Sequence, residues 1–314
     1  MRAPGDGSAV RRLLGQDVLA GLTVPMARQA MAGALSDLAS GALVAPLRQT
    51  VASPAGTTLL MPAWSRRTVA VKVLHLRPGN PDRGLPTISG ELVVSEQETG
   101  RLLALIDAPV LTALRTAGLA GLASRLMAPE DTTLGALIGA GFQAPFQARA
   151  MAEACPGLRR LRLFNRTRER ALALADALRA DLPQIELEVA ASVEAAVKGA
   201  QLVTTVTSAP KPLIRQRMLA SDCHINAMGA YTAHMAELGP DVLAHADQVY
   251  VDTMAGCAAE AGDLIQAAAA GAWSWSKAAV LPDTPRSQPG LTVFKSVGSA
   301  AFDLAAAEAL LGVG

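Results

Sequence analysis

The chain has 314 residues, of which 51% are hydrophobic and 3% aromatic, and this length and composition suit a two-domain α/β enzyme. Its 28 Lys and Arg residues almost balance its 27 Asp and Glu residues, which leaves a formal net charge of +1 at pH 7. This balance excludes a broad basic surface for nucleic acid or an anionic membrane, and no apolar run is long enough for a transmembrane helix.

The first third of the chain predicts one helix followed by a sheet. Apolar residues recur at helical spacing over residues 17–38. Short apolar segments follow, separated by turns rich in Gly, Pro, Asn and Asp. The predicted strands cover residues 43–50, 57–61, 68–75, 91–95 and 102–107, and a helix over residues 111–127 follows them.

The remainder alternates apolar segments with helical spacers, which is typical of parallel strands joined by helices. Six strands are predicted, over residues 134–138, 161–164, 185–189, 202–206, 223–228 and 248–252. A helix over residues 257–270, a strand over residues 291–295 and an amphipathic helix over residues 299–311 complete the chain. We therefore predict an α/β fold with a Rossmann-type doubly wound parallel sheet in residues 114–298. A sheet-rich domain is expected in residues 1–113, joined by the C-terminal helix of residues 299–314.

The most specific motif lies where the predicted strand over residues 134–138 ends. The turn there reads Gly139-Ala140-Gly141-Phe142-Gln143-Ala144 and opens a helical segment. In this G-x-G-x-x-A pattern, Gly139 permits the tight turn, Gly141 lets the backbone approach a pyrophosphate, and Ala144 lets the helix pack on the sheet. Because a second apolar strand follows at the distance of a βαβ unit, the turn predicts a dinucleotide site with phosphate at the helix N-terminus.

The residues after the next strand indicate which dinucleotide is bound. An NAD site usually has Asp or Glu here, which accepts hydrogen bonds from the adenosine ribose. This chain has Asn165-Arg166-Thr167-Arg168 instead. Arg166 can pair with a 2′-phosphate, and Asn165 and Thr167 can hydrogen-bond to it. We expect NADP(H) to be preferred over NAD(H); the alternative is that these arginines are solvated charges at a helix start.

The cysteines and histidines show no metal-binding pattern. Cys155, Cys223 and Cys257 are odd in number and widely spaced, so we expect buried free thiols rather than disulfides or metal ligands. The four histidines lack ligand spacing, so no metal is expected. The first 17 residues contain no apolar signal core, and we expect a cytoplasmic protein.

Three cations are candidates for binding a small carboxylate substrate. Lys72 interrupts the apolar face of a predicted strand, Arg48 lies in a similar strand, and Arg115 lies on the helix entering the nucleotide domain. Individually, Lys72 is as consistent with an edge-strand lysine in water, and each arginine with a surface charge. Together they are expected to border the cleft between domains, where a carboxylate would meet the nicotinamide.

With these residues, the chain resembles the ornithine cyclodeaminase/mu-crystallin family over nearly its whole length. The matching segments are Met61-Pro62, Lys72, Gly79-Asn80, Leu85-Pro86-Thr87, Leu111-Thr112, Arg115-Thr116, the turn from Gly139 to Ala144, Ile225-Asn226-Ala227-Met228-Gly229-Ala230, Glu260-Ala261-Gly262-Asp263-Leu264 and Thr292-Val293-Phe294-Lys295-Ser296-Val297-Gly298. So many ordered matches, with Gln143 in the glycine turn, are specific to this family rather than to Rossmann folds in general.

The resemblance implies a homodimer formed through the first domain, which also binds substrate, and a nicotinamide cofactor in the second. It implies that Arg48, Lys72 and Arg115 hold the substrate carboxylate, with Lys72 the catalytic residue as a proton donor or carboxylate partner; a bound water is the other candidate proton donor. It also implies further substrate contacts at Met61, Tyr231 and Glu260. The cofactor contacts it implies are Thr87, Arg115, Thr116, Gly139, Ala140, Gly141, Phe142, Gln143, Ala144, Asn165, Arg166, Thr167, Arg170, Val206, Thr207, Met228, Gly229 and Lys295.

One departure from the family pattern bears on the reaction. Cyclodeaminases of the family carry an aspartate two residues after the glycine that matches Gly229, and here that residue is Tyr231. A phenol is neutral near pH 7 and cannot pair with a substrate ammonium group as a carboxylate does. The sequence around Tyr231 is more similar to the ketimine reductases of the family.

The resemblance therefore implies NADPH-dependent reduction of cyclic α-imino acids, with 1-pyrroline-2-carboxylate reduced to L-proline and 1-piperideine-2-carboxylate the next substrate. One alternative is another reaction on the same scaffold: ornithine cyclodeamination, alanine dehydrogenation or reduction of acyclic imines. A second alternative is a non-enzymatic, mu-crystallin-like protein that binds NADP and a small ligand.

Overall fold

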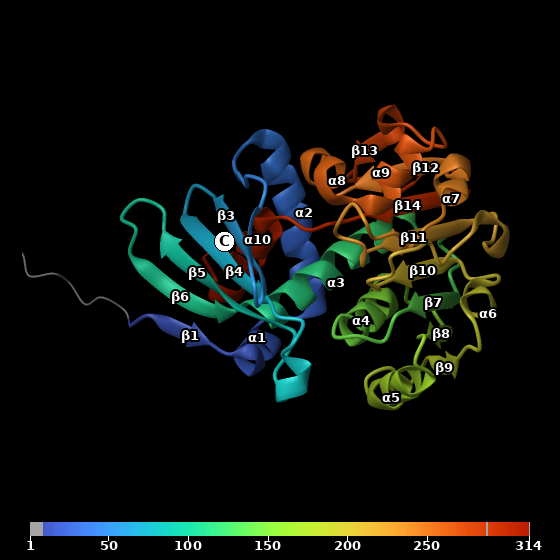
Figure 1. Cartoon of the computed structure of the whole chain (residues 1–314), viewed down its shortest axis with the longest axis horizontal. Coiled ribbons are helices and arrows are strands. Elements are labelled where there is room, and N and C mark those ends of the chain that lie inside the picture. The colour runs from blue at the N-terminus through green and yellow to red at the C-terminus, as the bar shows by residue number, and fades with distance from the viewer. Residues whose placement is uncertain (1–8, 287, 314) are drawn as a thin grey trace, which may run out of the picture. The chain divides into compact units, whose positions relative to one another are not determined.

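A computed structural model describes residues 9–286 and 288–313. Residues 1–8 of the predicted first domain lie outside the described residues, as does residue 314 at the end of the predicted C-terminal helix. The chain divides into two compact units, and the divisions fall at Arg115/Thr116 and at Gly298/Ser299. Unit 1 contains the N-terminal part and the C-terminal helix, and unit 2 contains the part between them (Figure 1).

Unit 1 is built on a six-stranded sheet with the strand order β1-β6-β5-β4-β3-β2. Strands β2 to β6 form an antiparallel meander, and β1 pairs with β6 in parallel. The strands are β1 (Arg11–Leu13), β2 (Gln49–Ser53), β3 (Gly56–Trp64), β4 (Thr68–Leu76), β5 (Ile88–Glu96) and β6 (Leu102–Asp107). The helices are α1 (Gly15–Gly21), α2 (Val24–Ser40), the short η1 (Pro81–Arg83) and α10 (Ala300–Leu311).

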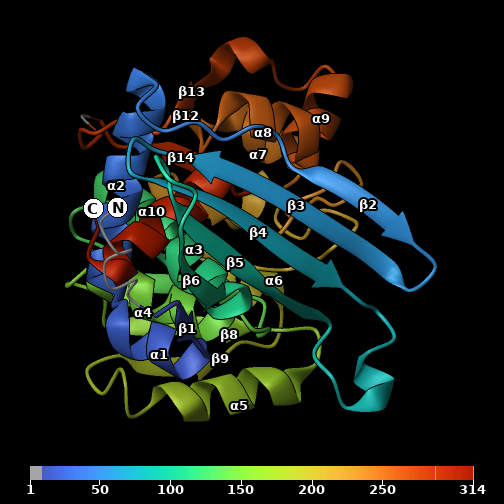
Figure 2. The ribbon, with the colours of Figure 1, turned by 90° about the vertical axis from the view of Figure 1, so that its left-hand side faces the viewer.

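The alternation of side chains along these strands separates a covered face from an open one. In residues 59–63 of β3 and 68–72 of β4 every second residue is buried, including Met61, Ala63, Ala70 and Lys72. Helix α10 packs against β3, β4 and α2 and covers this face, and in Figure 2 it is seen behind the strands. The C-terminal helix therefore completes the core of unit 1.

Unit 1 departs from the sequence prediction at β1, which was not predicted, and at three further places. The single helix predicted over residues 17–38 is wrong. α1 ends at Gly21, with Leu22 extended after it, and Thr23 caps the start of α2 by accepting a hydrogen bond from the Met26 N–H at 3.4 Å. Arg48 is not in a strand but in the segment before β2. The last helix is not amphipathic: residues 300–307 of α10 are all buried, because α10 is enclosed by the sheet and α2.

Unit 2 contains an eight-stranded parallel sheet with the order β13-β12-β14-β11-β10-β7-β8-β9. Its strands are β7 (Leu134–Ile138), β8 (Arg160–Phe164), β9 (Glu186–Val189), β10 (Leu202–Thr205), β11 (Cys223–Ala227), β12 (Gln248–Val251), β13 (Ala278–Val280) and β14 (Leu291–Lys295). Helix α3 (Ala108–Met127) belongs to unit 1 up to Arg115 and continues into unit 2. The other helices are α4 (Ala144–Ala154), α5 (Arg168–Leu178), α6 (Val193–Val197), α7 (Pro240–His245), α8 (Met254–Glu260), α9 (Gly262–Ala269), η2 (Gln216–Met218) and η3 (Trp275–Lys277).

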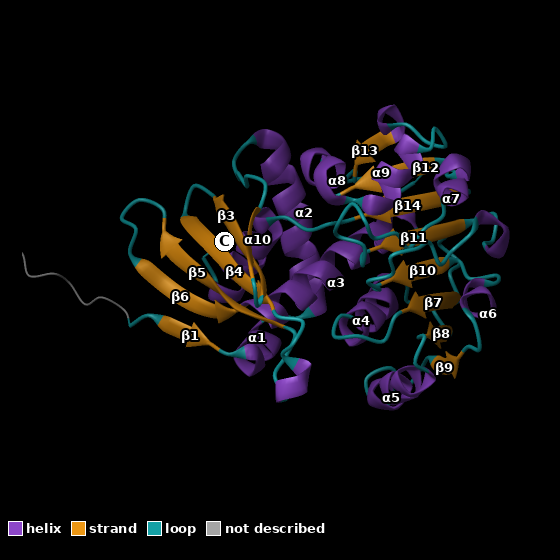
Figure 3. Cartoon of the chain, viewed as in Figure 1, coloured by secondary structure: helices purple, strands orange, loops and turns teal. Residues whose placement is uncertain are grey.

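The sheet of unit 2 is doubly wound, with helices on both faces (Figure 3). Leu137 of β7 lies in the core formed with α4 and α5, whereas its neighbours Ala136 and Ile138 lie in the core formed with α6, α7 and α9. The predicted α/β fold with a Rossmann-type sheet is therefore confirmed. The strand order reverses between β7 and β10, and at such a point the carboxyl ends of the strands open a crevice for a ligand.

All six predicted strands of this sheet are present, but two further strands join them. β14 inserts between β11 and β12, and β13 pairs with β12 at the edge. The helix predicted over residues 257–270 is wrong as a single element, because it divides at Ala261 into α8 and α9.

Within the described ranges, no helix is long and apolar enough to cross a membrane. The same residues contain no group of His, Cys, Asp and Glu that could hold a metal ion. Cys155, Cys223 and Cys257 are buried free thiols, as predicted.

Candidate active site

The glycine turn has the geometry that the sequence predicts. Gly139 follows β7 with φ +111°, and a Cβ on it would lie 2.8 Å from the Val206 carbonyl oxygen, so only glycine fits. A Cβ on Gly141 would meet nothing within 4 Å. The Oε1 atom of Gln143 is buried without a hydrogen-bond partner in the described structure. Helix α4 begins at Ala144, so open space, an unused acceptor and a helix N-terminus lie together, and the turn fits a dinucleotide phosphate.

Asn165 joins this turn to the loop after β8. Its Oδ1 accepts a hydrogen bond from the Ala140 N–H at 3.1 Å, and its Nδ2 donates to the Thr167 carbonyl oxygen at 2.9 Å. The side chains of Arg166, Thr167 and Arg170 are exposed. The Asn165 amide thus shapes the loop, while Arg166 is left accessible to an anionic ligand.

In unit 1, Lys72 lies on β4, a central strand of the sheet, and is only 1% exposed. The interpretation of Lys72 as an edge-strand lysine in water is therefore wrong. Its cross-strand neighbours on the covered face are Met61 of β3 and Leu92 of β5, both buried. An ammonium group among such neighbours needs a partner on the covering helix.

That partner is Asp303 of α10, which has no exposed surface. One oxygen of its carboxylate lies 2.6 Å from Lys72 Nζ, and the other accepts a hydrogen bond from Arg115 Nε at 3.0 Å. Lys72 Nζ also donates to the Thr112 hydroxyl at 3.3 Å. Lys72, Arg115 and Asp303 thus form a buried cation–carboxylate–cation cluster, termed the Lys72 cluster.

The environment of the Lys72 cluster sets its protonation. Burial lowers the pKa of Lys72 to about 8; Asp303 opposes this change, while the charges of Arg115 and Arg48 add to it. Burial acts to raise the pKa of Asp303, but the charges of Lys72 and Arg115 outweigh it and hold that pKa below its usual value. Arg48 therefore acts electrostatically on Lys72 from its half-buried position before β2.

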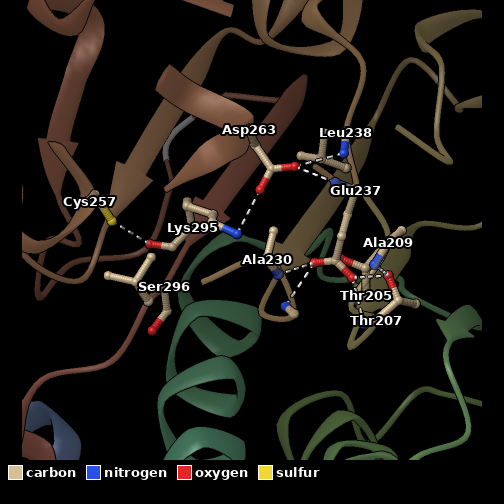
Figure 4. A network of polar contacts seen from close by, with 12 residues as sticks. Thr205, Thr207, Ala209, Ala230, Glu237, Leu238, Cys257, Asp263, Lys295 and Ser296 are labelled. Atoms are coloured by element: carbon tan, nitrogen blue, oxygen red, sulfur yellow. Dashed lines mark hydrogen bonds and ion pairs between the residues drawn. The ribbon is translucent and has the colours of Figure 1, made fainter. Parts of the chain in front are cut away.

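In unit 2, the loops after β10 and β11 meet at Glu237, a fully buried carboxylate that the sequence analysis missed (Figure 4). Its Oε1 accepts hydrogen bonds from the Thr207 N–H at 2.7 Å and the Thr207 hydroxyl at 2.8 Å. Its Oε2 accepts from the Gly229 N–H at 2.8 Å and the Ala230 N–H at 3.2 Å. Burial raises the pKa of Glu237, and the charge of Lys295 and the Thr207 hydrogen bonds oppose that rise.

A second buried pair supports Glu237 (Figure 4). Lys295 Nζ lies 2.7 Å from Asp263 Oδ2, and neither side chain has exposed surface. The other oxygen of Asp263 accepts from the main-chain N–H groups of Glu237 and Leu238, at 2.6 and 2.9 Å. Burial alone acts to lower the pKa of Lys295, but the carboxylates of Asp263 and Glu237 raise it. The structure thus places the predicted cofactor residue Lys295 in an ion pair inside unit 2.

The remaining predicted residues divide between the two units. In unit 1, Thr87 is exposed after η1, and its carbonyl accepts from the Arg77 N–H. In unit 2, Thr116 is buried on α3, and the half-buried residues are Val206 after β10, Met228 and Tyr231 after β11, and Glu260 at the end of α8. The structure therefore groups Met61, Lys72 and Arg115 in unit 1, and Thr207 with Gly229 in unit 2.

Comparison with known proteins identifies the family. The sequence model of the ornithine cyclodeaminase/mu-crystallin family matches residues 13–311. The chain belongs to this family. It is 34% identical to the Delta(1)-pyrroline-2-carboxylate/Delta(1)-piperideine-2-carboxylate reductase of Azospirillum brasilense, covering 92% of the chain and 91% of the relative. It is 30% identical to the ketimine reductase mu-crystallin of Mus musculus, covering 91% and 90%.

Solved structures show the same fold. The Thermococcus litoralis Delta(1)-pyrroline-2-carboxylate reductase, solved with NADH and L-proline, superposes with a TM-score of 0.90 at 24% identity, covering 96% of this chain and 97% of that one. An archaeal alanine dehydrogenase dimer with bound NAD superposes with a TM-score of 0.88 at 26% identity, covering 96% and 95%. Family membership, predicted from the sequence motifs, is confirmed, and the relatives include named oxidoreductases of C=N bonds.

Proposed function

We propose that the protein is an NADPH-dependent reductase of cyclic α-imino acids, which converts 1-pyrroline-2-carboxylate to L-proline and accepts 1-piperideine-2-carboxylate as a second substrate. The observation that carries this proposal is the Lys72 cluster. It combines cations that can bind a carboxylate with a lysine whose pKa, about 8, is near neutral pH. The names of the relatives from Azospirillum brasilense and Mus musculus support the same reaction class.

In this proposal Arg48, Arg115 and Lys72 bind and orient the substrate carboxylate. Bound NADPH supplies the hydride that reduces the C=N carbon. Asp303 offsets one of the three positive charges, and the substrate carboxylate offsets a second. A protonated imine is therefore less destabilised in this site than it would be beside three cations whose charges were not offset.

Lys72 is also the proposed proton donor. With a pKa of about 8, its Nζ holds a proton at neutral pH and can release one to the imine nitrogen at modest cost. The ion pair with Asp303 and the hydrogen bond to Thr112 hold the Lys72 ammonium group in place.

Tyr231 argues against ornithine cyclodeamination, the second candidate. It follows Gly229 by two residues, in the loop that Glu237 anchors. Deamination requires a group that accepts a proton from the substrate amine, and a neutral phenol is poorly suited to that task. Reduction of a preformed imine has no such requirement.

The proposed cofactor preference rests on the loop after β8. Arg166 is exposed there, and Asn165 holds the loop against the glycine turn in place of an acidic residue. We infer that Arg166 pairs with the 2′-phosphate of NADPH.

We also propose a homodimer formed through unit 1. On the face of the sheet opposite α10, four half-buried apolar side chains form a row across neighbouring strands: Pro62, Val71, Val93 and Leu105. Figure 2 shows this side of the strands in front of α10. A second copy of the chain would bury the row, and an apolar sheet face of this kind favours association.

The reaction class is tested by a substrate panel. Oxidation of NADPH is measured with 1-pyrroline-2-carboxylate, 1-piperideine-2-carboxylate, and pyruvate with ammonia or methylamine, and ammonia release is measured from L-ornithine with NAD(P). The proposal expects turnover of the cyclic imino acids and no ammonia from L-ornithine. Robust ammonia release would restore the cyclodeaminase assignment, turnover of pyruvate with amines alone would favour an alanine dehydrogenase or acyclic imine reductase, and NADPH binding without turnover of any substrate would favour a ligand-binding protein.

A further inference from the structure

Glu237 joins two loops that are far apart in the sequence. The loop after β10 begins at Val206, and the loop after β11 begins at Met228. The carboxylate gives one oxygen to Thr207 of the first loop and the other to Gly229 and Ala230 of the second. Each oxygen accepts two hydrogen bonds, so both acceptor positions are used to hold the loops together.

The main chain around Glu237 reinforces this connection. The Glu237 carbonyl oxygen accepts from the N–H groups of Leu213 and Ile214 at 2.8 and 3.0 Å, and the Ala236 N–H donates to the Ala209 carbonyl oxygen at 3.0 Å. A Cβ on Gly229 would collide with the Thr207 backbone and with Glu237, so the loops touch with no room for a side chain. Asp263, paired with Lys295, holds the N–H of Glu237 from the other side.

These loops lie where the sheet geometry places the nicotinamide half of a dinucleotide. A pyrophosphate bound at the glycine turn would lie over the end of β7, with Arg166 after β8 on one side of it. The adenosine half would then extend toward β8, and the nicotinamide half would extend over the ends of β10 and β11, across the point where strand order reverses. Thr207 and Gly229 follow those two strands.

We propose that Glu237 is a positioning residue for the nicotinamide half of the cofactor: its carboxylate fixes the Thr207 and Gly229 loops as the surface on which that half rests. This inference rests on the proposed dinucleotide site. Glu237 itself is buried beneath the loops and acts through them.

The substitution Glu237→Gln separates this role from simple structural support. Glutamine keeps the size of the side chain, but it replaces one acceptor oxygen by an NH₂ group, which cannot accept from an N–H. One loop must therefore lose its anchor while the other keeps it. The matched control is Asp247→Asn. Asp247 directly precedes β12, at the amino end of the same sheet, and its carboxylate accepts a hydrogen bond from the Leu291 N–H at 2.9 Å.

The test compares two ligands of the full-length protein. The Kd of NADPH is measured from its nicotinamide fluorescence, and the Kd of adenosine 2′,5′-bisphosphate, which lacks the nicotinamide half, is measured by calorimetry. We expect Glu237→Gln to weaken NADPH about tenfold or more, as the loss of charge-assisted hydrogen bonds implies, and to leave the bisphosphate within about twofold of the unchanged protein. Asp247→Asn should bind both ligands as the unchanged protein does.

The outcomes are distinguishable. Equal weakening of both ligands, or no change for NADPH, would overturn the role of Glu237. Failure of the unchanged protein to bind either ligand would overturn the proposed cofactor site and this inference with it. If Glu237→Gln does not fold, Thr207→Val removes one hydroxyl donor to Glu237 and keeps the N–H. Thr207→Val should weaken the binding of NADPH but not that of the bisphosphate. Thr207→Ser, which keeps the hydroxyl, should bind NADPH as the unchanged protein does. Any other pattern would contradict the proposal.

Discussion

The substitution Asp303→Asn tests the Lys72 cluster. It keeps the shape of the side chain and removes the negative charge that lies 2.6 Å from Lys72 Nζ and 3.0 Å from Arg115 Nε. Lys72 would remain buried with Arg115 and Arg48 acting on it and no carboxylate to oppose them. The loss of one charge-assisted interaction, about 1.5–3 kcal/mol, corresponds to a fall of about 1–2 in the pKa of Lys72.

The sign of the pH effect follows from this change. In the unchanged protein Lys72 loses its proton near pH 8, so the activity that needs the ammonium group should decline above pH 8. In Asp303→Asn the same decline should begin about 1–2 pH units lower. Removing one partner of a buried pair costs about 3–5 kcal/mol of stability. This loss should become smaller as the pH rises toward 8. In that range Lys72 of the folded variant has lost its proton while Lys72 of the unfolded chain still binds one, so the stability of the variant rises with pH.

The assay measures kcat/KM for 1-pyrroline-2-carboxylate between pH 6 and 9.5 in both proteins. Because the imine itself titrates, binding of pyrrole-2-carboxylate, whose ring nitrogen is not basic, is measured over the same range. The matched control is Glu308→Gln, since Glu308 also lies on α10 but accepts from the Ser65 and Thr68 hydroxyls rather than from cations. An alkaline limb at the same pH in Asp303→Asn and in the unchanged protein would refute the role given to Asp303.

Three further predictions follow from single contacts. Arg166→Ala should weaken NADPH about tenfold or more and leave NADH nearly unchanged, and equal Michaelis constants for both cofactors in the unchanged protein would contradict the assignment. Val71→Glu places a charge in the open apolar row of the unit 1 sheet and should convert the dimer to a monomer in light scattering; a dimer that persists would place the interface elsewhere. Burial lowers the pKa of His224 to about 3, so below pH 6.5 the unfolded chain is protonated at His224 and the folded protein is not. The free energy of unfolding should therefore fall by about 2 kcal/mol between pH 7 and 5 through this residue. In urea unfolding, the fall for His224→Gln should be smaller by that amount, and equal falls in both proteins would show that His224 does not titrate on unfolding.

Local sequence pattern was sufficient for the glycine turn and for the strands of unit 2 other than β13, which was not predicted. Glycine at positions 139 and 141 and apolar segments at βαβ spacing are local signals, and the structure places each at the predicted residues. The insertion of β14 between β11 and β12 is not visible in sequence order, because a strand's neighbours are set by crossover connections over long distances.

The partners of the site depended on tertiary structure. The alternation of side chains along β4 did not determine whether Lys72 is exposed to water or buried in the core. The position of β4 between β3 and β5 shows that it is buried. Asp303 lies more than 200 residues after Lys72 in the sequence, and the sequence signal was an acid within the otherwise apolar residues 300–307. Glu237 had a similar signal beside the apolar pair Ala236 and Leu238, but nothing in the sequence connects it to Thr207.

Product analysis tests the central claim most directly. The protein is incubated with NADPH and 1-pyrroline-2-carboxylate, and NADP formed and L-proline formed are quantified in the same sample by chiral chromatography. We predict one L-proline for each NADPH oxidised, with Lys72→Met inactive but folded. Oxidation of NADPH without proline, or no oxidation at all while NADPH binds, would contradict the assignment as an imino acid reductase.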